Sequence, residues 1–164
     1  MFKMTRRARK VLNLAYYEAK LRQQDTITGE YILLAMVREG HGIGAQVLQE
    51  AGITLHLVQE RLHFTPMQGI VSTPEHSFWR RWSGRLGLYH ELHSWDALGL
   101  ASDARACIEQ SAIAAQRLGH HYIGTEHLLL GLLESGNDTV MLFLHGRGIA
   151  TEQVEHSIHK QLVR

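Results

Sequence analysis

An internal repeat limits the possible folds of this sequence more than any other feature. When the chain is compared with itself at an offset of 96 positions, identical and similar residues align in both halves. The identical pairs include Ala8 and Ala104, Arg9 and Arg105, Ala19 and Ala115, Ile27 and Ile123, Glu30 and Glu126, Leu33 and Leu129, Leu34 and Leu130, Gly40 and Gly136, Leu48 and Leu144, Gly52 and Gly148, Ile53 and Ile149, and Val58 and Val154. We therefore expect two copies of one unit, residues 2–63 and 98–162, within a single domain that spans residues 1–164.

Apolar residues within each copy are spaced as they are on amphipathic helices. They recur every three or four positions, and a capping residue such as Thr28 or Thr54 precedes several of the runs. Gly52 follows one run, where glycine readily takes the left-handed conformation that ends a helix. The helices predicted in this way cover residues 8–19, 28–40, 43–51, 54–62, 104–118, 125–133, 140–144 and 151–162. No alternating strand pattern is present, so the sequence predicts an all-α fold of two four-helix units, about eight helices in total.

Charge balance and cysteine content exclude several classes of function. Lys and Arg number 17 and Asp and Glu number 16, so no excess of positive charge favours a nucleic-acid backbone. Cys107 is the only cysteine, and it can form neither an internal disulfide nor a cysteine-rich zinc site. No signal peptide follows Met1, and no apolar run approaches the ~18 residues of a membrane span. We expect a cytoplasmic protein without nucleic-acid or membrane partners, in which Cys107 is a buried, inert thiol.

Residues 64–97 interrupt the repeat and differ from it in composition. Both prolines and all three tryptophans of the chain lie in this segment. We expect a long inserted linker, a kind of connection that is often functional when it is ordered. On a helix, Trp79 and Trp82 would share one face, with Arg80 and Arg81 between them. That face either packs on the repeats, which is the interpretation we favour, or forms an exposed surface for a partner.

Histidine-rich segments raise the question of a metal site or an enzyme. His120-His121 and Glu126-His127 invite that interpretation, but the chain has no H-E-x-x-H zinc motif. It also has no G-x-x-x-x-G-K-[ST] nucleotide loop and no Ser/His/Asp arrangement that can be located with any specificity. The sequence therefore predicts no catalytic residue, no metal and no cofactor. A metal-dependent hydrolase is kept as a remote alternative.

Glu30 and Glu126 stand at the same point of the two copies, in the first turn of the second helix. A carboxylate there is favoured by the helix dipole, typically by ~0.3–1 kcal/mol, and this structural interpretation is sufficient by itself. The repetition of the charge also suits a symmetric pair of cation-binding sites. A carboxylate can hold a guanidinium through two hydrogen bonds, and a neighbouring helix N-terminus offers N–H groups to an anion.

Specific motifs in both copies point to a known family. Residues 119–133 read G-H-H-Y-I-G-T-E-H-L-L-L-G-L-L, which resembles the L-G-H-x-x-I-G-T-E-H-L-L-L-G-L-L signature of Clp N-terminal repeats. The first copy is similar through 5–12 (T-R-R-A-R-K-V-L), 27–34 (I-T-G-E-Y-I-L-L) and 37–48 (V-R-E-G-H-G-I-G-A-Q-V-L). These repeats form the N-terminal domain of the ClpC and ClpA type AAA+ unfoldases. The resemblance implies two four-helix repeats related by pseudo-twofold symmetry.

The same resemblance implies a non-enzymatic binding module of the Clp system. In that family the domain captures substrates and adaptor proteins for a hexameric unfoldase, which feeds the ClpP peptidase. The ClpC branch reads phosphoarginine-tagged proteins with one pocket per repeat: the motif glutamate holds the guanidinium, and a Thr that opens the first helix meets the phosphoryl group. The ligand-binding residues carried over in this way are Glu30 with Thr5 in one pocket, and Glu126 with Thr125 and Ser102 in the other.

Three departures from the family pattern affect these expectations. The first copy has Thr28-Gly29 where the motif has Gly-Thr, and Ala101 stands where the second pocket would have its Thr, with Ser102 beside it as a substitute. The second pocket is therefore expected to be the weaker phosphate site. The sequence ends at Arg164 without an AAA+ module, as a free-standing protein or a fragment would. The functions to compare are an adaptor or substrate-binding module and, as an alternative, a decoy that sequesters ligands of a Clp unfoldase.

Overall fold

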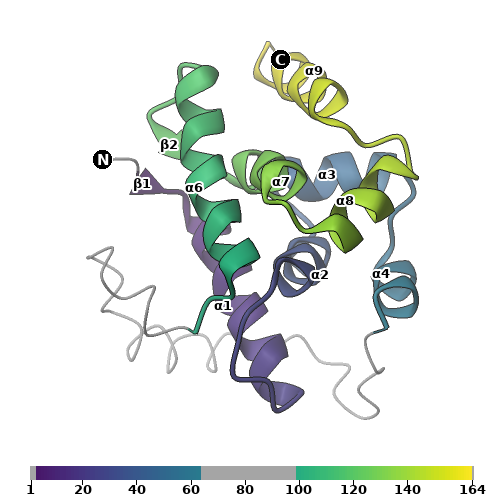
Figure 1. Ribbon diagram of the computed structural model, residues 1–164. Helices are drawn as coiled ribbons and strands as arrows, with labels where there is room; N and C mark the ends of the chain where they lie inside the picture. The colour runs from purple at the N-terminus through teal and green to yellow at the C-terminus, as the bar shows by residue number, and fades with distance from the viewer. Residues whose placement is uncertain (1–2, 64–98, 164) are drawn as a thin grey trace.

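The computed structural model describes residues 3–63 and 99–163, which form two short strands and eight helices (Figure 1). The elements of the first copy are β1 (Lys3–Met4), α1 (Arg6–Leu21), α2 (Gly29–Glu39), α3 (Ile43–Glu50) and α4 (Leu55–Arg61). Those of the second copy are α6 (Ser102–Arg117), β2 (Tyr122–Ile123), α7 (Thr125–Glu134), α8 (Asp138–His145) and α9 (Thr151–Leu162). The all-α fold with two four-helix repeats is confirmed. The segment with Trp79, Arg80, Arg81 and Trp82 lies outside the described residues.

Local sequence signals set most of the helix boundaries. The hydroxyl of Thr5 accepts a hydrogen bond from the Ala8 N–H over 3.2 Å, and Thr54 caps α4 in the same way. Thr28 occupies the N-cap position of α2, as predicted, but its side chain makes no capping bond. Gly52 has a φ of +74°, so the predicted left-handed end of α3 is confirmed.

Helices α2 and α7 form the centre of the core. Every residue of α7 from Thr125 to Leu133 is buried, and α2 is buried on all sides over residues 31–36. A helix that is apolar all round must be covered on all sides. In Figure 1, α7 accordingly lies between α6 and α3, with α9 beside it, while α1 packs along α2. Cys107 of α6 is fully buried in this core, and burial raises the pKa of its thiol to about 12.

Backbone hydrogen bonds join the two repeats symmetrically. The N–H of Thr5 donates to the carbonyl of Ile123, and the N–H of Ala101 donates to the carbonyl of Ile27, both over 2.9 Å. Each of these bonds becomes the other when 96 is added to, or subtracted from, its residue numbers. The segment that leads into the first helix of one repeat therefore pairs with the segment that leads into the second helix of the other.

This pairing produces two features that the sequence did not predict. Strands β1 and β2 are parallel, with Lys3 opposite Tyr122 and Met4 opposite Ile123, and Ile27 forms the symmetric isolated bridge with Leu100. Two residues are too few to produce an alternating pattern, so such strands cannot be seen in the sequence.

Among the described helices, none combines the length and the apolar character that a membrane crossing needs.

Candidate functional site

Glu126, in the first turn of α7, has a buried carboxylate with no cationic side chain paired to it among the described residues. The residue is 3% exposed. Its carboxylate lies over Gly124, where a Cβ atom would overlap both carboxylate oxygens. Burial raises the pKa of Glu126, and the Glu126 backbone N–H offsets this only in part. The site therefore holds an acidic group whose charge is not compensated.

The neighbouring His127 is neutral and makes hydrogen bonds with both ring nitrogens. The Gly124 N–H donates to Nδ1 over 2.9 Å, so Nδ1 carries no proton. Nε2 must then carry the proton and donate to Nδ1 of His120, 2.8 Å away. Burial, followed by the nearby His120, lowers the pKa of His127 to about 4. The 3.5 Å approach of His127 Nδ1 to Glu126 Oε1 is therefore not an ion pair.

The hydrogen bonds of His127 test the alternative that the chain is a metal-dependent hydrolase, because such an enzyme needs a metal site. His120, Glu126 and His127 each place one potential ligand atom within 4.8 Å of the others. Both nitrogens of His127 are already used, and Glu126 Oε1 approaches Nδ1, whereas His120 bonds to Nε2 on the other edge of the ring. A metal ion cannot take a ligand atom from all three residues without breaking these bonds. His120 and His127 form a hydrogen-bonded pair beside the Glu126 carboxylate, and a metal ion bound by all three residues would have to replace that bond.

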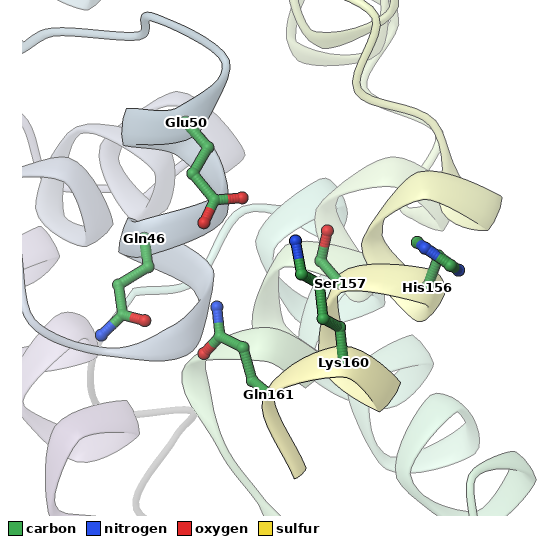
Figure 2. A pocket seen from close by; sticks show the side chains of 6 residues that line it. All are labelled: Gln46, Glu50, His156, Ser157, Lys160 and Gln161. Atoms are coloured by element: carbon green, nitrogen blue, oxygen red, sulfur yellow. The ribbon is translucent and has the colours of Figure 1, made fainter. Parts of the chain in front are cut away.

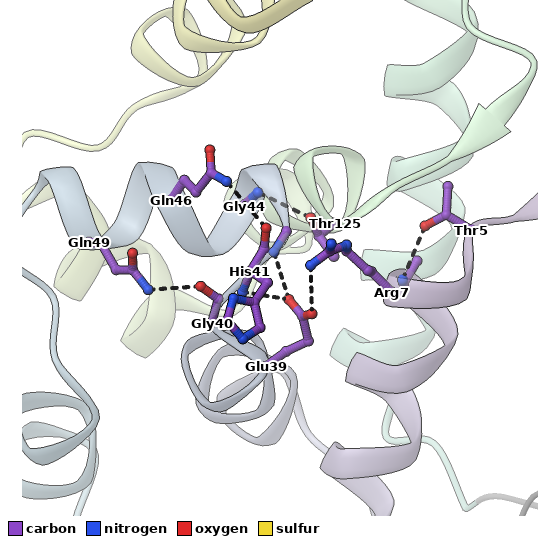
Figure 3. A network of polar contacts seen from close by, with 11 residues as sticks. Thr5, Arg7, Glu39, Gly40, His41, Gly44, Gln46, Gln49 and Thr125 are labelled. Atoms are coloured by element: carbon purple, nitrogen blue, oxygen red, sulfur yellow. Dashed lines mark hydrogen bonds and ion pairs between the residues drawn. The ribbon is translucent and has the colours of Figure 1, made fainter.

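Thr125 and Arg7 belong to a polar network beside Glu126 that joins α1, α2, α3 and α7 (Figure 3). The Gly44 N–H donates to the Thr125 hydroxyl over 3.1 Å. The buried carboxylate of Glu39 accepts the Gly42 N–H over 2.8 Å and lies 3.5 Å from Nη1 of Arg7. The Arg7 side chain remains 55% exposed. The first turn of α1 therefore places an accessible positive charge near the start of α7.

Glu30, in the first turn of α2, has different surroundings. Its carboxylate accepts a hydrogen bond from Nδ2 of Asn137 over 3.1 Å. The same Nδ2 donates to Asp103 over 2.6 Å, and Asp103 accepts the Gly29 N–H over 2.7 Å. Glu30 is thus linked to two polar side chains of the second repeat, and one of them is a second carboxylate.

The predicted site residues are grouped across the repeats and not within them. Thr5 bonds to Ile123, beside the segment that leads to Glu126, and Ala101 bonds to Ile27, beside the segment that leads to Glu30. The sequence prediction groups Glu30 with Thr5 in one pocket and Glu126 with Ser102 in the other. The structure places Thr5 beside the segment that leads to Glu126, and the exposed Ser102 beside the segment that leads to Glu30. Symmetric pairing of the two repeats is the physical reason.

Sequence analysis missed four residues that determine these surroundings. Asn137 precedes a predicted helix, so its capping function could have been inferred, but its contact with Glu30 could not. Arg7 and Asp103 carried no signal, because their partners lie 32 or more positions away in the chain, and the same distance separates Glu39 from Arg7. Repeat alignment places Arg7 and Asp103 at equivalent positions, so one pocket has a positive charge where the other has a negative one.

A separate polar cavity of about 390 Å³ lies between α3 and α9 (Figure 2). It is lined by Gln46, Glu50, His156, Ser157, Lys160 and Gln161. In Figure 2, the α3 side chains Gln46 and Glu50 face those of α9. None of the predicted ligand-binding residues lines this cavity.

Comparisons with known proteins agree on one family. A family model described as the Clp repeat (R) N-terminal domain matches residues 3–77 and 96–164. The chain is 31% identical to the chaperone protein ClpB of Oceanobacillus iheyensis over 156 residues, which are 95% of this chain and 17% of that protein. It is also 31% identical to the negative regulator of genetic competence ClpC/MecB of Bacillus subtilis, over 95% of this chain and 16% of that protein. The chain spans about a sixth of the length of these curated relatives.

Solved structures show the same fold. The N-terminal domain of the chaperone ClpD from Arabidopsis thaliana superimposes with a TM-score of 0.64 at 16% identity, covering 98% of this chain and 97% of that one. The Hsp104 N-terminal domain from Candida albicans gives a TM-score of 0.60 at 16% identity, covering 94% of this chain and 88% of that one.

Proposed function

The chain belongs to the Clp repeat N-terminal domain family, and from this premise we propose that it is a non-catalytic module that binds substrates or adaptors of a Clp unfoldase. The ligand we propose is a protein that carries phosphoarginine. The partners are then the tagged substrate or an adaptor on one side and the Clp unfoldase with its ClpP peptidase on the other.

The observation that carries this proposal is the uncompensated carboxylate of Glu126. A guanidinium group would neutralise it and form two charge-assisted hydrogen bonds, a pairing for which arginine has the best geometry. Arg7 and the Thr5 hydroxyl lie at the start of α1, across the β1–β2 pairing from the segment that leads to Glu126. They would meet a phosphoryl group. A ligand with a guanidinium and a phosphate on adjacent atoms matches both charges.

Binding at this site requires a small rearrangement. Glu126 is buried over Gly124, so the carboxylate must turn outward to meet a ligand. Because burial makes the charged form of this carboxylate unfavourable, turning toward a cation relieves a cost that the free protein carries.

Calorimetric titration with matched peptides tests the proposal. One peptide carries phosphoarginine, and the controls carry arginine or phosphoserine at the same position. We expect binding of the phosphoarginine peptide and at least a tenfold weaker response to either control, since each control has only one of the two charged groups. Equal binding of all three peptides, or binding of none, would contradict phosphoarginine recognition.

The decoy function is separated from the adaptor function by a degradation assay. An adaptor increases the rate at which a ClpC–ClpP complex degrades an arginine-phosphorylated substrate, because it delivers that substrate. A decoy decreases the rate, because it withholds the substrate from the N-domains of the unfoldase. The Glu126→Gln variant serves as the control in both cases and should leave the rate unchanged.

A further inference from the structure

The two repeats carry the same two residue types in opposite order where their second helices begin. The first repeat has Thr28-Gly29 and the second has Gly124-Thr125. In both repeats the first of the two residues is the N-cap and the second is the first residue of the helix. The position that lacks a Cβ atom therefore differs between two otherwise equivalent sites.

At the N-cap this exchange determines where the glutamate can lie. The Glu126 carboxylate occupies the space that a Cβ atom of residue 124 would fill. Thr28 has a Cβ atom at the equivalent position, so the Glu30 carboxylate cannot adopt the same placement. It reaches toward the second repeat instead and accepts the hydrogen bond from Asn137.

At the first helical position the exchange determines what approaches the helix. A Cβ atom on Gly29 would lie 2.9 Å from Oδ2 of Asp103 and 3.3 Å from Nδ2 of Asn137. Glycine therefore provides the space in which the Asp103 carboxylate accepts the Gly29 N–H. In the second repeat this space holds the Thr125 side chain, whose hydroxyl bonds to the Gly44 N–H.

Orientation of the Asn137 amide is fixed by a different bond. Its Oδ1 accepts the Val140 N–H over 3.0 Å and caps α8, so the Nδ2 group must face Glu30 and Asp103. Because Oδ1 of Asn137 faces α8 and Nδ2 faces Glu30, the amide acts as a hydrogen-bond donor to Glu30, as a guanidinium would. Asp103 presents an anion to the N-terminus of α2, as a phosphate would.

We propose that Asp103 and Asn137 fill the Glu30 site as an internal ligand, so that the domain binds one phosphoarginine, at Glu126, and not two. This inference rests on the function proposed above. Electrostatics favour the same assignment, because the exposed Arg7, which pairs with Glu39 near the start of α7, has a positive charge, whereas the equivalent Asp103 has a negative charge that repels a phosphoryl group. Because of Ala101, the sequence predicted that the Glu126 pocket is the weaker phosphate site. The present proposal makes the Glu30 pocket the weaker one.

Stoichiometry of phosphoarginine peptide binding is the first test. We expect one site per chain, a loss of affinity of about tenfold or more in Glu126→Gln, and unchanged affinity in Glu30→Gln. Two sites per chain, or a comparable loss in Glu30→Gln, would overturn the inference while leaving the proposed function in place. Absence of any binding would contradict the proposed function. The closure of the Glu30 site by Asp103 would then be tested by a measurement that needs no ligand.

The ligand-free test removes the internal ligand. Asp103→Ala leaves the buried Gly29 N–H without its acceptor and removes one of the two acceptors of the Asn137 amide, so the melting temperature should fall by several degrees. Asp138→Ala is the matched control, because Asp138 is an exposed aspartate in the first turn of α8 and should cost less. Equal melting temperatures for the two variants would show that Asp103 does not close the site.

Exchanging the two residues tests the cause directly. The double variant Thr28→Gly with Gly29→Thr should displace Asp103 and create a second binding site, so that two peptides bind per chain. If this variant does not fold, Asp103→Ala supplies the same readout with Gly29 left in place. A stoichiometry that stays at one in a folded Thr28→Gly, Gly29→Thr variant would contradict the steric explanation.

Discussion

The N–H of Gly124 donates to Nδ1 of His127 across the first turn of α7, over 2.9 Å. This bond replaces the contact that a Glu or Gln side chain makes in a capping box, and it requires an unprotonated Nδ1. Because His120 occupies the other ring nitrogen, protonation of His127 disrupts a fully used set of bonds inside the core. The start of the central helix is therefore sensitive to acid.

We expect stability to decrease as the pH falls below about 6.5. The pKa of His127 in the folded protein is about 4, below its ordinary value of 6.5, so the folded state prefers the neutral ring. The stabilisation is complete above pH 6.5 and is lost progressively as the pH falls toward 4. Between pH 7 and pH 5 this amounts to about 2 kcal/mol. Denaturant unfolding at a series of pH values measures it.

His127→Gln provides the matched control, because its side-chain oxygen can still accept the Gly124 N–H. The variant should lose most of the decrease in stability between pH 7 and pH 5. An unaltered pH dependence in His127→Gln would show that His127 is not the titrating group.

Gly131 is predicted to be essential for the packing of α7 against α6. A Cβ atom at this position would overlap the Cys107 carbonyl oxygen and the Ser111 hydroxyl. Gly131→Ala should therefore destabilise the protein by about 1–3 kcal/mol, even though alanine favours helices. The equivalent Ala35 in α2 already has a Cβ atom within the core, so the requirement belongs to the second repeat alone. Unfolding in urea measures the loss, and a stabilised Gly131→Ala variant would refute this account of the packing.

Glu18 is predicted to hold α1 against α2 through buried charges. Glu18 is 1% exposed, and its carboxylate pairs with Arg22, the C-cap residue of α1, and with Nε of Arg38 of α2. Removal of one member of a buried ion pair typically costs 3–5 kcal/mol, so Glu18→Ala should lower stability by roughly that amount. Asp25→Ala is the control, since the Lys20–Asp25 pair is exposed and should contribute about 0–1 kcal/mol. Similar losses in the two variants would contradict the assignment.

The fold was predictable because its signals are local or periodic. Helix spacing, the capping residues and glycines such as Gly52 act over a few positions, and the 96-residue repeat multiplies each signal by two. The short strands were not predictable, because they arise only when one repeat meets the other. Glu18 also carried no signal, since its equivalent in the second repeat is the apolar Ala114.

The candidate site was predictable only in part. The repeated glutamates and their family motif identified Glu30 and Glu126, but both environments depend on contacts between distant segments. Asn137 lies 107 positions from Glu30 in the chain, and Asp103 lies 74 positions from Gly29. Such contacts follow from the packing of the repeats, which residue spacing does not specify.

One comparison separates a ligand site at Glu126 from a carboxylate that only stabilises a helix. Burial raises the pKa of Glu126, so the charged form destabilises the folded state above pH ~4.5 and the penalty disappears below it. A carboxylate retained for the helix dipole would instead contribute about 0.3–1 kcal/mol of stability. Replacement by the neutral, isosteric glutamine therefore changes stability in opposite directions under the two interpretations.

The most direct measurement is the melting temperature of Glu126→Gln at pH 7, with and without the phosphoarginine peptide. We predict a melting temperature above that of the parent protein and no further increase with peptide. The parent protein should melt at a higher temperature when peptide is added. A Glu126→Gln variant that melts below the parent, or that is stabilised by peptide as much as the parent is, would contradict the assignment of Glu126 as the ligand-binding carboxylate.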